Sequence, residues 1–325
     1  MRVVITGGAG FLGKRLAKRL LDRGTLRGPD GGHEPLDQIV LLDVVPAEGF
    51  SDGRIRTVAA DITDTNTLQG VIESDVRSVF HLAAVVSGQA EADFDLGMRV
   101  NFDATRLLLE RLRHLANGAR VVMTSSVAVF GGELPVLVPD NQVWAPQSSY
   151  GTQKAMADLL LSDYTRKGFV DGRSVRLPTI VVRPGKPNLA ASSFASGIIR
   201  EPLNGQDAIC PVAPETILWL MSPRQVIDNL LHAHDLPAEQ LGTRRVINLP
   251  GLSIRVADMI AALESVAGPR VTAQIRMQRD PKVEQIVNSW PGNFSADYAK
   301  SLGFVADTDF TDIIRAFIED EKVVI

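Results

Sequence analysis

Three glycines, spaced Gly-x-x-Gly-x-x-Gly at Gly7, Gly10 and Gly13, constrain this chain more than any other feature. They directly follow an apolar run at 3–5 and open a helical pattern over 11–23. In that setting Gly7 allows a tight turn, Gly10 lets the backbone approach a pyrophosphate, and Gly13 lets helix and strand pack closely. The start of the helix supplies free N–H groups and the positive end of its dipole. The pattern predicts a dinucleotide-binding βαβ unit.

A carboxylate is the second mark of such a unit, and Asp43 provides one directly after the apolar run 39–42. It lies beyond the ~20 residues typical of the motif. We attribute the excess to the Gly/Pro-rich segment 25–37, which is expected to be an exposed loop. A carboxylate that accepts from both ribose hydroxyls repels a 2′-phosphate, so Asp43 favours NAD over NADP. The alternative is a surface aspartate in a loop.

Short apolar runs alternate with helical patterns, which predicts a parallel sheet with right-handed crossovers. The expected strands are 3–5, 39–42, 79–82, 120–123, 174–177 and 245–249. The expected helices are 11–23, 96–115, 150–166, 225–234 and 254–266, the last capped by Leu252-Ser253. Nine of the 18 prolines fall between Pro178 and Pro250, which favours irregular connections there.

These patterns predict an α/β fold, a doubly wound parallel (Rossmann) sheet with a smaller, interleaved C-terminal substrate lobe. The expected dinucleotide-binding domain is 1–182 with 222–250, and the expected substrate lobe is 183–221 with 251–325.

The composition excludes several classes of protein. A net charge of -4, from 34 basic and 38 acidic residues, gives no footprint for nucleic acid or an anionic membrane. Cys210 is the single cysteine, so neither an internal disulfide nor a thiolate metal site is expected, and Cys210 has no assigned role. No apolar run reaches the ~18 residues of a membrane span, and no leader-like segment follows Met1. We expect a cytoplasmic protein.

A serine, a tyrosine and a lysine form the candidate catalytic group. Tyr150 and Lys154 are four residues apart on a predicted helix, so both face one cleft. A phenol with a pKa of ~10 is a poor base at neutral pH, and a nearby ammonium together with a cationic nicotinamide ring is expected to lower that pKa. Ser126 follows a predicted strand, at the edge where such sheets bind ligands. The alternative is a half-buried tyrosine and a solvated lysine.

With these residues in place, the chain resembles the extended short-chain dehydrogenases/reductases, the NAD-dependent epimerase/dehydratase superfamily. The residues that carry the resemblance are Gly7–Gly13, Asp43, Asp61-Ile62, His81–Ala84, Asn101, Ser126, Tyr150 and Lys154. Ser126 rather than Ser125 matches the family serine, and Phe130 replaces a tyrosine that is usual there.

The resemblance implies NAD as the cofactor and assigns it further residues. Asp61 and Ile62 would contact adenine, Leu82 and Ala83 would flank the adenosine and pyrophosphate, and Lys154 would bridge the nicotinamide ribose. The same cofactor site would also include Phe11, Leu12, Asn101 and Pro178. In this superfamily the helices matching 96–115 and 150–166 pair across a dimer, so we expect a homodimer.

The chain departs from the sugar-nucleotide enzymes after the strand 174–177. Thr179 stands where those enzymes carry an asparagine, and the cations Arg183 and Lys186 follow. Such cations suit a carboxylate, Arg183 in particular through a bidentate fork. The alternative is a pair of solvated loop charges. This stretch, with 188–194 and 200–205, resembles the D-erythronate dehydrogenase group, which oxidises the C2 hydroxyl of a four-carbon sugar acid to 2-oxo-tetronate.

By that resemblance Arg183 and Lys186 meet the carboxylate of the acid, beside Thr179. Ser126 hydrogen-bonds the C2 oxygen, Tyr150 phenolate removes its proton, and Ser87 holds a distal hydroxyl. Two alternatives stay open. One is a nucleotide-sugar epimerase or dehydratase that retains its NAD, and the other is a non-catalytic NAD-binding regulator.

His232 and His234 project from different faces of a helix, so no metal site is expected. His81, inside a predicted strand, is expected to be a hydrogen-bonded core group, and Trp219 is expected to pack in the core.

Overall fold

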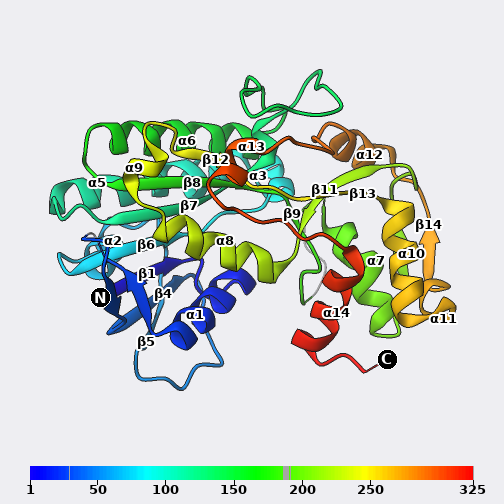
Figure 1. The fold of residues 1–325 in the computed structure, drawn as a ribbon, viewed down its shortest axis with the longest axis horizontal. Coiled ribbons are helices and arrows are strands. Elements are labelled where there is room, and N and C mark those ends of the chain that lie inside the picture. Colours follow the sequence, from blue (N-terminus) through cyan, green and yellow to red (C-terminus); the bar gives the residue numbers. More distant parts are fainter. Residues whose placement is uncertain (29, 186–189, 191, 325) are drawn as a thin grey trace.

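The computed structural model describes residues 1–28, 30–185, 190 and 192–324, which form a large sheet domain and a smaller lobe beside it (Figure 1). The large sheet has seven strands in the order β12-β8-β7-β6-β1-β4-β5, and every pair in it is parallel. Their bounds are β1 (Arg2–Thr6), β4 (Gln38–Asp43), β5 (Ile55–Ala59), β6 (Val76–His81), β7 (Arg120–Ser126), β8 (Asp171–Leu177) and β12 (Val246–Asn248). The predicted doubly wound α/β fold is confirmed.

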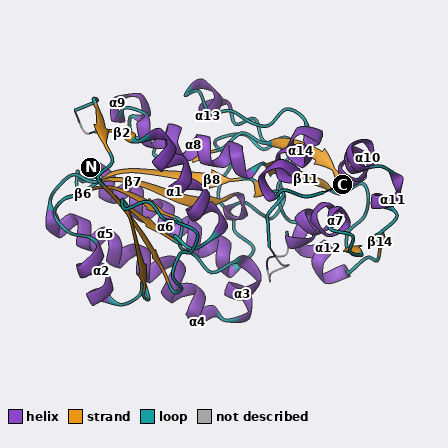
Figure 2. Ribbon diagram, turned by 90° about the horizontal axis from the view of Figure 1, so that it is seen from below, coloured by secondary structure: helices purple, strands orange, loops and turns teal. Residues whose placement is uncertain are grey.

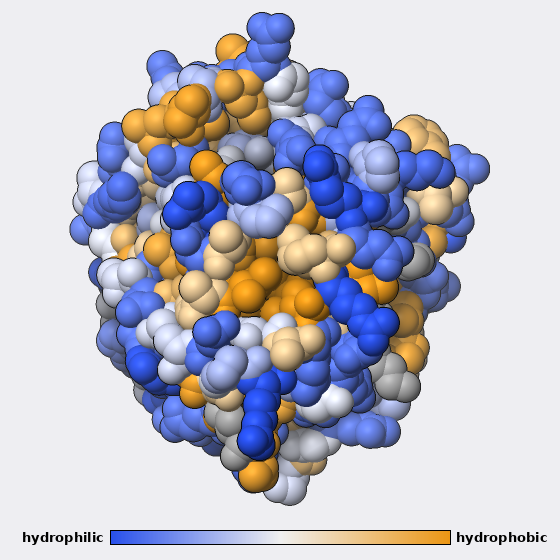
Figure 3. All heavy atoms as spheres, turned by 90° about the vertical axis from the view of Figure 1, so that its right-hand side faces the viewer, coloured by the Kyte–Doolittle hydropathy of each residue, from blue (hydrophilic) through white to orange (hydrophobic). Residues whose placement is uncertain are grey.

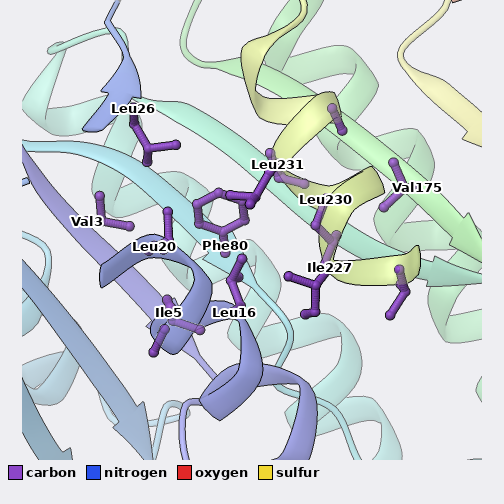
Figure 4. Packing of buried hydrophobic residues seen from close by; sticks show 14 of the residues in the cluster. Val3, Ile5, Leu16, Leu20, Leu26, Phe80, Val175, Ile227, Leu230 and Leu231 are labelled. Atoms are coloured by element: carbon purple, nitrogen blue, oxygen red, sulfur yellow. The ribbon is translucent and has the colours of Figure 1, made fainter. Parts of the chain in front are cut away.

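Helices cover both faces of this sheet (Figure 2). One face packs against α1 (Phe11–Arg23) and α8 (Pro223–Asp235). The other packs against α2 (Thr65–Val71), α5 (Ala104–Leu115) and α6 (Ser149–Arg166). Because successive side chains of a strand point to opposite faces, Val3 and Ile5 join Leu16, Leu20 and Phe80 in one core, while Val4 joins the other (Figure 4).

Two local predictions were wrong, and one strand was not predicted. The segment 25–37 is not an exposed loop, because β2 (Thr25–Arg27) and β3 (His33–Pro35) form a hairpin whose Leu26 is buried. The Leu252-Ser253 cap is absent, since β13 (Leu252–Arg255) runs up to α10 (Val256–Ala267), and Arg255 caps that helix without a side-chain bond. β5 was missed because its outer side chains are exposed, so the apolar run that marks a buried strand is lacking.

The predicted helix 96–115 is broken into three pieces. It begins as α4 (Phe94–Gly97), widens into a π-helix over Met98–Asp103, and continues as α5. π-Helical turns are rare and concentrate at functional sites. Here the wide turn carries Asn101, which lies beside the candidate site described below.

The smaller lobe is built from two short sheets and a group of helices. Its sheets combine β9 (Thr179–Ile180), β11 (Ile217–Met221) and β13, and β10 (Ala208–Cys210) with β14 (Ile275–Met277). Its helices are α7 (Ser193–Leu203), α10, α11 (Pro269–Thr272), α12 (Pro281–Asn288) and α14 (Phe310–Glu321). The remaining short helices are α3 (Ser87–Ala92), α9 (Ala238–Leu241), α13 (Asp297–Ser301) and the 3₁₀ turn Val127–Val129.

We propose the predicted division of the chain, 1–182 with 222–250 and 183–221 with 251–325, as two lobes of one molecule, with β9 as the part of the first that pairs with β11 of the second. Contacts cross that boundary: Ala299 and Phe304 pack in the same core as Leu230 of α8.

Viewed from the end of the smaller lobe, the surface has apolar groups near its centre, surrounded by hydrophilic ones (Figure 3). Across the described part of the chain, no helix is both long and apolar enough to cross a membrane.

Candidate active site

The predicted cofactor residues line up along one edge of the large sheet. Because β6, β1, β4 and β5 are adjacent and parallel, the residues that follow them share the carboxyl edge, where open α/β sheets bind ligands. After β6 come Leu82 and Ala83, after β1 comes Gly7, β4 ends at Asp43, and Asp61 follows β5. The order of the strands therefore places residues that are far apart in the sequence side by side along one edge of the sheet.

The three glycines fit a pyrophosphate. Gly7 has a φ of +70°, and a Cβ there would lie 2.9 Å from the backbone N of Ala83. A Cβ on Gly13 would lie 2.3 Å from the Gly7 carbonyl oxygen, so helix and loop are in contact only because it is glycine. Gly10 caps α1 without a side-chain hydrogen bond and is exposed, which leaves the first N–H groups of the helix available to an anion.

Asp43 lies at the position expected for ribose recognition. Its carboxylate accepts from the backbone N–H of Ala9 in the glycine loop at 3.0 Å and from that of Val44 at 2.8 Å. These bonds fix the carboxylate against the loop while leaving it half-buried. At the next strand Asp61 is exposed and accepts from Thr63 N–H at 2.8 Å, and Ile62 is buried beside it.

A cavity of about 200 Å³ lies next to this row, and the residues predicted to bind and oxidise the substrate line it. Predicted cofactor residues Phe11, Leu12 and Pro178 line it, as do predicted substrate residues Ser87, Ser126, Tyr150, Thr179 and Arg183. Residues from both lobes therefore meet in one cavity. Lys186 lies outside the described residues.

Ser126 and Tyr150 face each other in this cavity. The Ser126 hydroxyl oxygen accepts from Ala128 N–H at 3.1 Å, so its own proton points away from Ala128 and can be donated to the Tyr150 oxygen or to a ligand. Burial raises the pKa of Tyr150 to about 12, while the neighbouring Ser126 hydroxyl and the Arg183 guanidinium lower it. In the protein alone burial outweighs these effects, and the cation that acts on the phenol is Arg183. The lowering expected from Lys154 together with the nicotinamide ring stays a prediction for the enzyme with NAD bound.

Lys154 is buried below the Tyr150 ring. Its Nζ lies 5.8 Å from the ring centroid and donates to the Thr124 carbonyl at 3.0 Å. Burial lowers the pKa of Lys154 to about 8, and the Asp158 carboxylate opposes that shift. Among the described residues Thr124 is its one hydrogen-bond acceptor, so two N–H groups remain for ligand hydroxyls. Together with the glycine cradle and Asp43, these donors fit a bound NAD.

Arg183 is a largely buried cation on the wall of the cavity. Its guanidinium donates to Ser192 Oγ at 3.3 Å, and no carboxylate among the described residues forms an ion pair with it. Its backbone is fixed on both sides, since its N–H donates to Ser196 Oγ at 3.0 Å and its carbonyl accepts from Arg200 at 2.7 Å. Burial and the Arg200 charge lower the pKa of Arg183. Such a cation has unused capacity for an anion.

Asn101 supports the site from behind. Its Oδ1 accepts from Val85 N–H at 2.9 Å, and its Nδ2 donates to Val85 O at 3.3 Å and to Gln153 Oε1 at 2.8 Å. These bonds tie the loop after β6 to the helix that carries Tyr150 and Lys154. We assign Asn101 a positioning role as a proposal, since its side chain is already engaged by protein groups.

A buried polar network beneath the site was not predicted. The Asp158 carboxylate, one helical turn after Lys154, accepts from Ser125, Ser174 and Arg176. Arg176 in turn stacks over Trp144, with its guanidinium carbon 3.8 Å from the ring centroid. These residues come from four separate segments, so no local pattern reveals them. The network explains why Ser125, although it lines the cavity, is engaged elsewhere while Ser126 faces Tyr150.

The expectations for Trp219 and His81 are confirmed. Trp219 packs in the core against Phe294, with ring centroids 5.6 Å apart. It is Trp290 that lines the cavity, a residue sequence reasoning missed. His81 is buried between the hydroxyls of Thr6 and Thr105, at 2.7 and 2.9 Å. In the described part of the chain, no cluster of side chains suits a metal ion.

Two buried histidines make stability pH-dependent. Burial lowers the pKa of His81 to about 3 and that of His234 to about 4, from an ordinary 6.5. Below pH 6.5 the unfolded chain therefore binds more protons. We expect the free energy of unfolding to fall between pH 6.5 and 4, by up to about 1.4 kcal/mol per pH unit for each histidine. Urea unfolding across this range measures the slope. His234→Asn should reduce it, whereas the same change at exposed His33 should not; equal slopes in both variants would contradict the prediction.

Comparison with known proteins agrees with this geometry. A family model described as "NAD dependent epimerase/dehydratase family" matches residues 3–235. The chain is 58% identical over 320 residues to D-erythronate dehydrogenase of Cupriavidus necator, covering 98% of each chain. It is 47% identical to D-erythronate dehydrogenase of Haemophilus influenzae, covering 98% of this chain and 99% of that one. A solved structure, the nucleoside-diphosphate-sugar epimerase from Agrobacterium tumefaciens, matches with a TM-score of 0.92 at 43% identity, over 99% of this chain and 94% of that one. The chain belongs to the NAD-dependent epimerase/dehydratase family, and its cofactor is NAD.

Proposed function

We propose that this protein is a D-erythronate dehydrogenase, which oxidises the C2 hydroxyl of the four-carbon acid to a ketone. The balanced reaction converts D-erythronate and NAD to 2-oxo-tetronate, NADH and a proton. Two full-length relatives of that name, 58% and 47% identical, support the substrate. The single structural observation that carries the proposal is the presence of Arg183, a buried cation, in the same cavity as Ser126 and Tyr150.

Different residues of the site are proposed to bind the substrate and to transfer its proton. Arg183 binds the carboxylate of the acid, since a charge-assisted fork is the strongest pairing such a group can form. Ser126 then donates to the C2 oxygen with the proton that Ala128 leaves available. Lys186 and Thr179 are proposed to assist Arg183, and Ser87 to hold a distal hydroxyl.

Tyr150 removes the proton of the C2 hydroxyl group as the C2–H bond breaks. The bound NAD supplies the hydride acceptor. In the protein alone burial disfavours phenolate, and the cation acting against that effect is Arg183. Lys154, with two N–H groups left after its bond to Thr124, holds the ribose hydroxyls and thereby orients the cofactor against Tyr150. Gly7, Gly10, Gly13, Phe11, Leu12, Asp43, Asp61, Ile62, Leu82, Ala83 and Pro178 are proposed as the rest of the cofactor site.

One assay tests the function. The enzyme is incubated with NAD and a panel of four-carbon aldonic acids and UDP-sugars, and NADH absorbance and sugar products are followed. Net NADH with D-erythronate, and not with its stereoisomers, supports the proposal. No NADH with any of these acids would overturn it.

The name of the Agrobacterium structure favours a second candidate, a nucleotide-sugar epimerase with retained NAD. Conversion of a UDP-sugar without net NADH would support that candidate. Thr179, at the position where those enzymes carry an asparagine, counts against it. Inertness together with NAD binding would support a non-catalytic regulator.

Asp43 is proposed to select NAD over NADP. Asp43→Ala removes a carboxylate that repels a 2′-phosphate, so the ratio of kcat/KM for NAD over NADP should fall about tenfold or more. Steady-state kinetics with both cofactors measure this ratio. Asp61→Ala is the control, because the proposed contact to adenine is common to both cofactors and the ratio should not move. An unchanged ratio in Asp43→Ala would remove Asp43 from this role.

We also propose a cytoplasmic homodimer joined through α5 and α6. These helices are in contact with each other, and two apolar side chains of the same layer, Phe94 and Leu159, are each 59% exposed. Cys210 is a free, buried thiol, as expected in a reducing compartment. Sedimentation velocity tests the dimer. Leu159→Glu should shift the protein to the monomer mass, and a wild-type monomer at all concentrations would contradict the proposal.

A further inference from the structure

Two cavities of this molecule meet at one large side chain. The substrate cavity of about 200 Å³ and a second cavity of about 510 Å³ share three lining residues, Ser87, Ala128 and Trp290. Ser87 and Ala128 have small side chains and come from the sheet domain. Trp290, just after α12 of the smaller lobe, is the large one. Trp290 is therefore the largest of the side chains that border both spaces.

The chain holds Trp290 in place from both sides. The backbone N–H of Trp290 donates to the Val287 carbonyl at 3.1 Å, and Val287 is buried in the core of the smaller lobe. Two residues further on, the Gly292 carbonyl accepts from Ser253 Oγ at 2.7 Å. A Cβ at Gly292 would lie 3.0 Å from the Ile217 side chain, so this segment lies tightly against β11. These contacts fix the backbone on both sides of Trp290, and its side chain packs against the core of the smaller lobe.

The first cavity has room for a short acid. Phe11 and Leu12 from the start of α1 line it together with Tyr150 and Arg183, so cofactor and substrate share its volume. In the proposed binding mode the carboxylate meets Arg183, C2 lies beside Tyr150 and a distal hydroxyl meets Ser87. Ser87 and Trp290 both border the second cavity as well, so a longer acid bound in this mode approaches that cavity.

The second cavity has the chemistry of a site for sugar hydroxyls. Hydroxyl and amide side chains line it, namely Ser148, Ser289, Gln147 and Gln285. Among its described lining residues the one charged side chain is Glu91, whose carboxylate accepts from Ser149 N–H at 2.9 Å. An uncharged polyhydroxyl chain can hydrogen-bond to such groups, whereas a second anion would meet no cation there.

We propose that Trp290 determines the chain length of the acid this enzyme oxidises, by closing the substrate cavity against the second one. The proposal rests on the proposed function. Trp290→Ala joins the two cavities and admits five- and six-carbon aldonic acids, whose distal hydroxyls enter the second cavity. Trp290→Phe keeps a ring in the wall and retains the preference for four carbons.

The experiment compares kcat/KM for four-, five- and six-carbon aldonic acids of matching C2 and C3 configuration, with NAD saturating. In Trp290→Ala the ratio of six-carbon to four-carbon acid should rise at least tenfold over wild type, the scale that pocket size ordinarily sets. Trp290→Leu should give an intermediate rise, and it keeps the proposal testable if the alanine variant does not fold. Ile286→Ala is the matched control, because Ile286 lines only the second cavity and its loss leaves the wall intact.

The outcomes separate the two proposals. Wild-type enzyme that oxidises no four-carbon acid overturns the proposed function. Wild-type oxidation of D-erythronate, with an unchanged length ratio in folded Trp290→Ala and Trp290→Leu, overturns the role of Trp290 alone. A rise in the ratio that Ile286→Ala reproduces also overturns it, since a general loosening of the lobe would then be the cause. KM for NAD should stay within about twofold in every variant.

Discussion

Tyr150→Phe is expected to lower kcat for the sugar acid about a thousandfold while leaving the affinity for NAD near its wild-type value. The substitution removes only the hydroxyl group that takes the C2 proton, and general-base catalysis contributes roughly 10²–10⁴-fold. The ring still occupies the cavity and still covers Lys154, whose Nζ lies 5.8 Å from its centroid. The measurement is steady-state kinetics with D-erythronate, alongside titration of NAD by calorimetry.

The structure offers a matched control for this result. Tyr164 lies on the same helix, with its hydroxyl bonded to Glu110 and away from the cavity. Tyr164→Phe should therefore leave kcat unchanged. A Tyr150→Phe enzyme that keeps more than about a tenth of wild-type kcat would exclude Tyr150 as the base, since losing a general base costs far more.

Arg183→Ala is expected to raise KM for D-erythronate by about 10- to 100-fold, with little change in KM for NAD. Hydrogen bonds to a charged group contribute about 1.5–3 kcal/mol each, and 1.4 kcal/mol corresponds to a factor of ten. A smaller fall in kcat should accompany it, because the Arg183 charge also lowers the pKa of Tyr150. Equal effects on both KM values would contradict the carboxylate assignment.

Arg183→Lys separates the two effects of this residue. A lysine keeps the positive charge beside Tyr150 but loses the bidentate fork. We expect KM for the acid to rise while kcat stays near wild type. Arg99→Ala, at an exposed position outside the cavity, should change neither constant.

The residues proposed to bind the cofactor could be picked out from the sequence because their signals are local. Gly7, Gly10 and Gly13 lie within one turn and the start of one helix, where backbone geometry demands glycine. Tyr150 and Lys154 are one helical turn apart, so helix geometry alone places them on one face. The parallel strands were recognisable because burial on both faces requires continuous apolar runs, and exposed β5 was missed for the lack of one.

Contacts between segments that are far apart in the sequence decided the electrostatics of the site and the buried network beneath it. The pKa of Tyr150 depends on burial and on the charge of Arg183. Arg183 is far from Tyr150 in the sequence, so the residues around Tyr150 do not predict its effect. Asp158 meets Ser125, Ser174 and Arg176 only because α6 packs on β7 and β8.

The sequence by itself therefore determined the fold, the glycine loop and the spacing of the proposed catalytic residues Tyr150 and Lys154, since short-range backbone geometry and periodic burial fix each of them. The tertiary structure decided which charges act on the phenol and which side chain closes the substrate cavity. Trp290 carries no local signal, because its role arises only where the smaller lobe meets the carboxyl edge of the sheet. Electrostatics and steric closure act through space, so they depend on how the two lobes pack rather than on the order of residues along the chain.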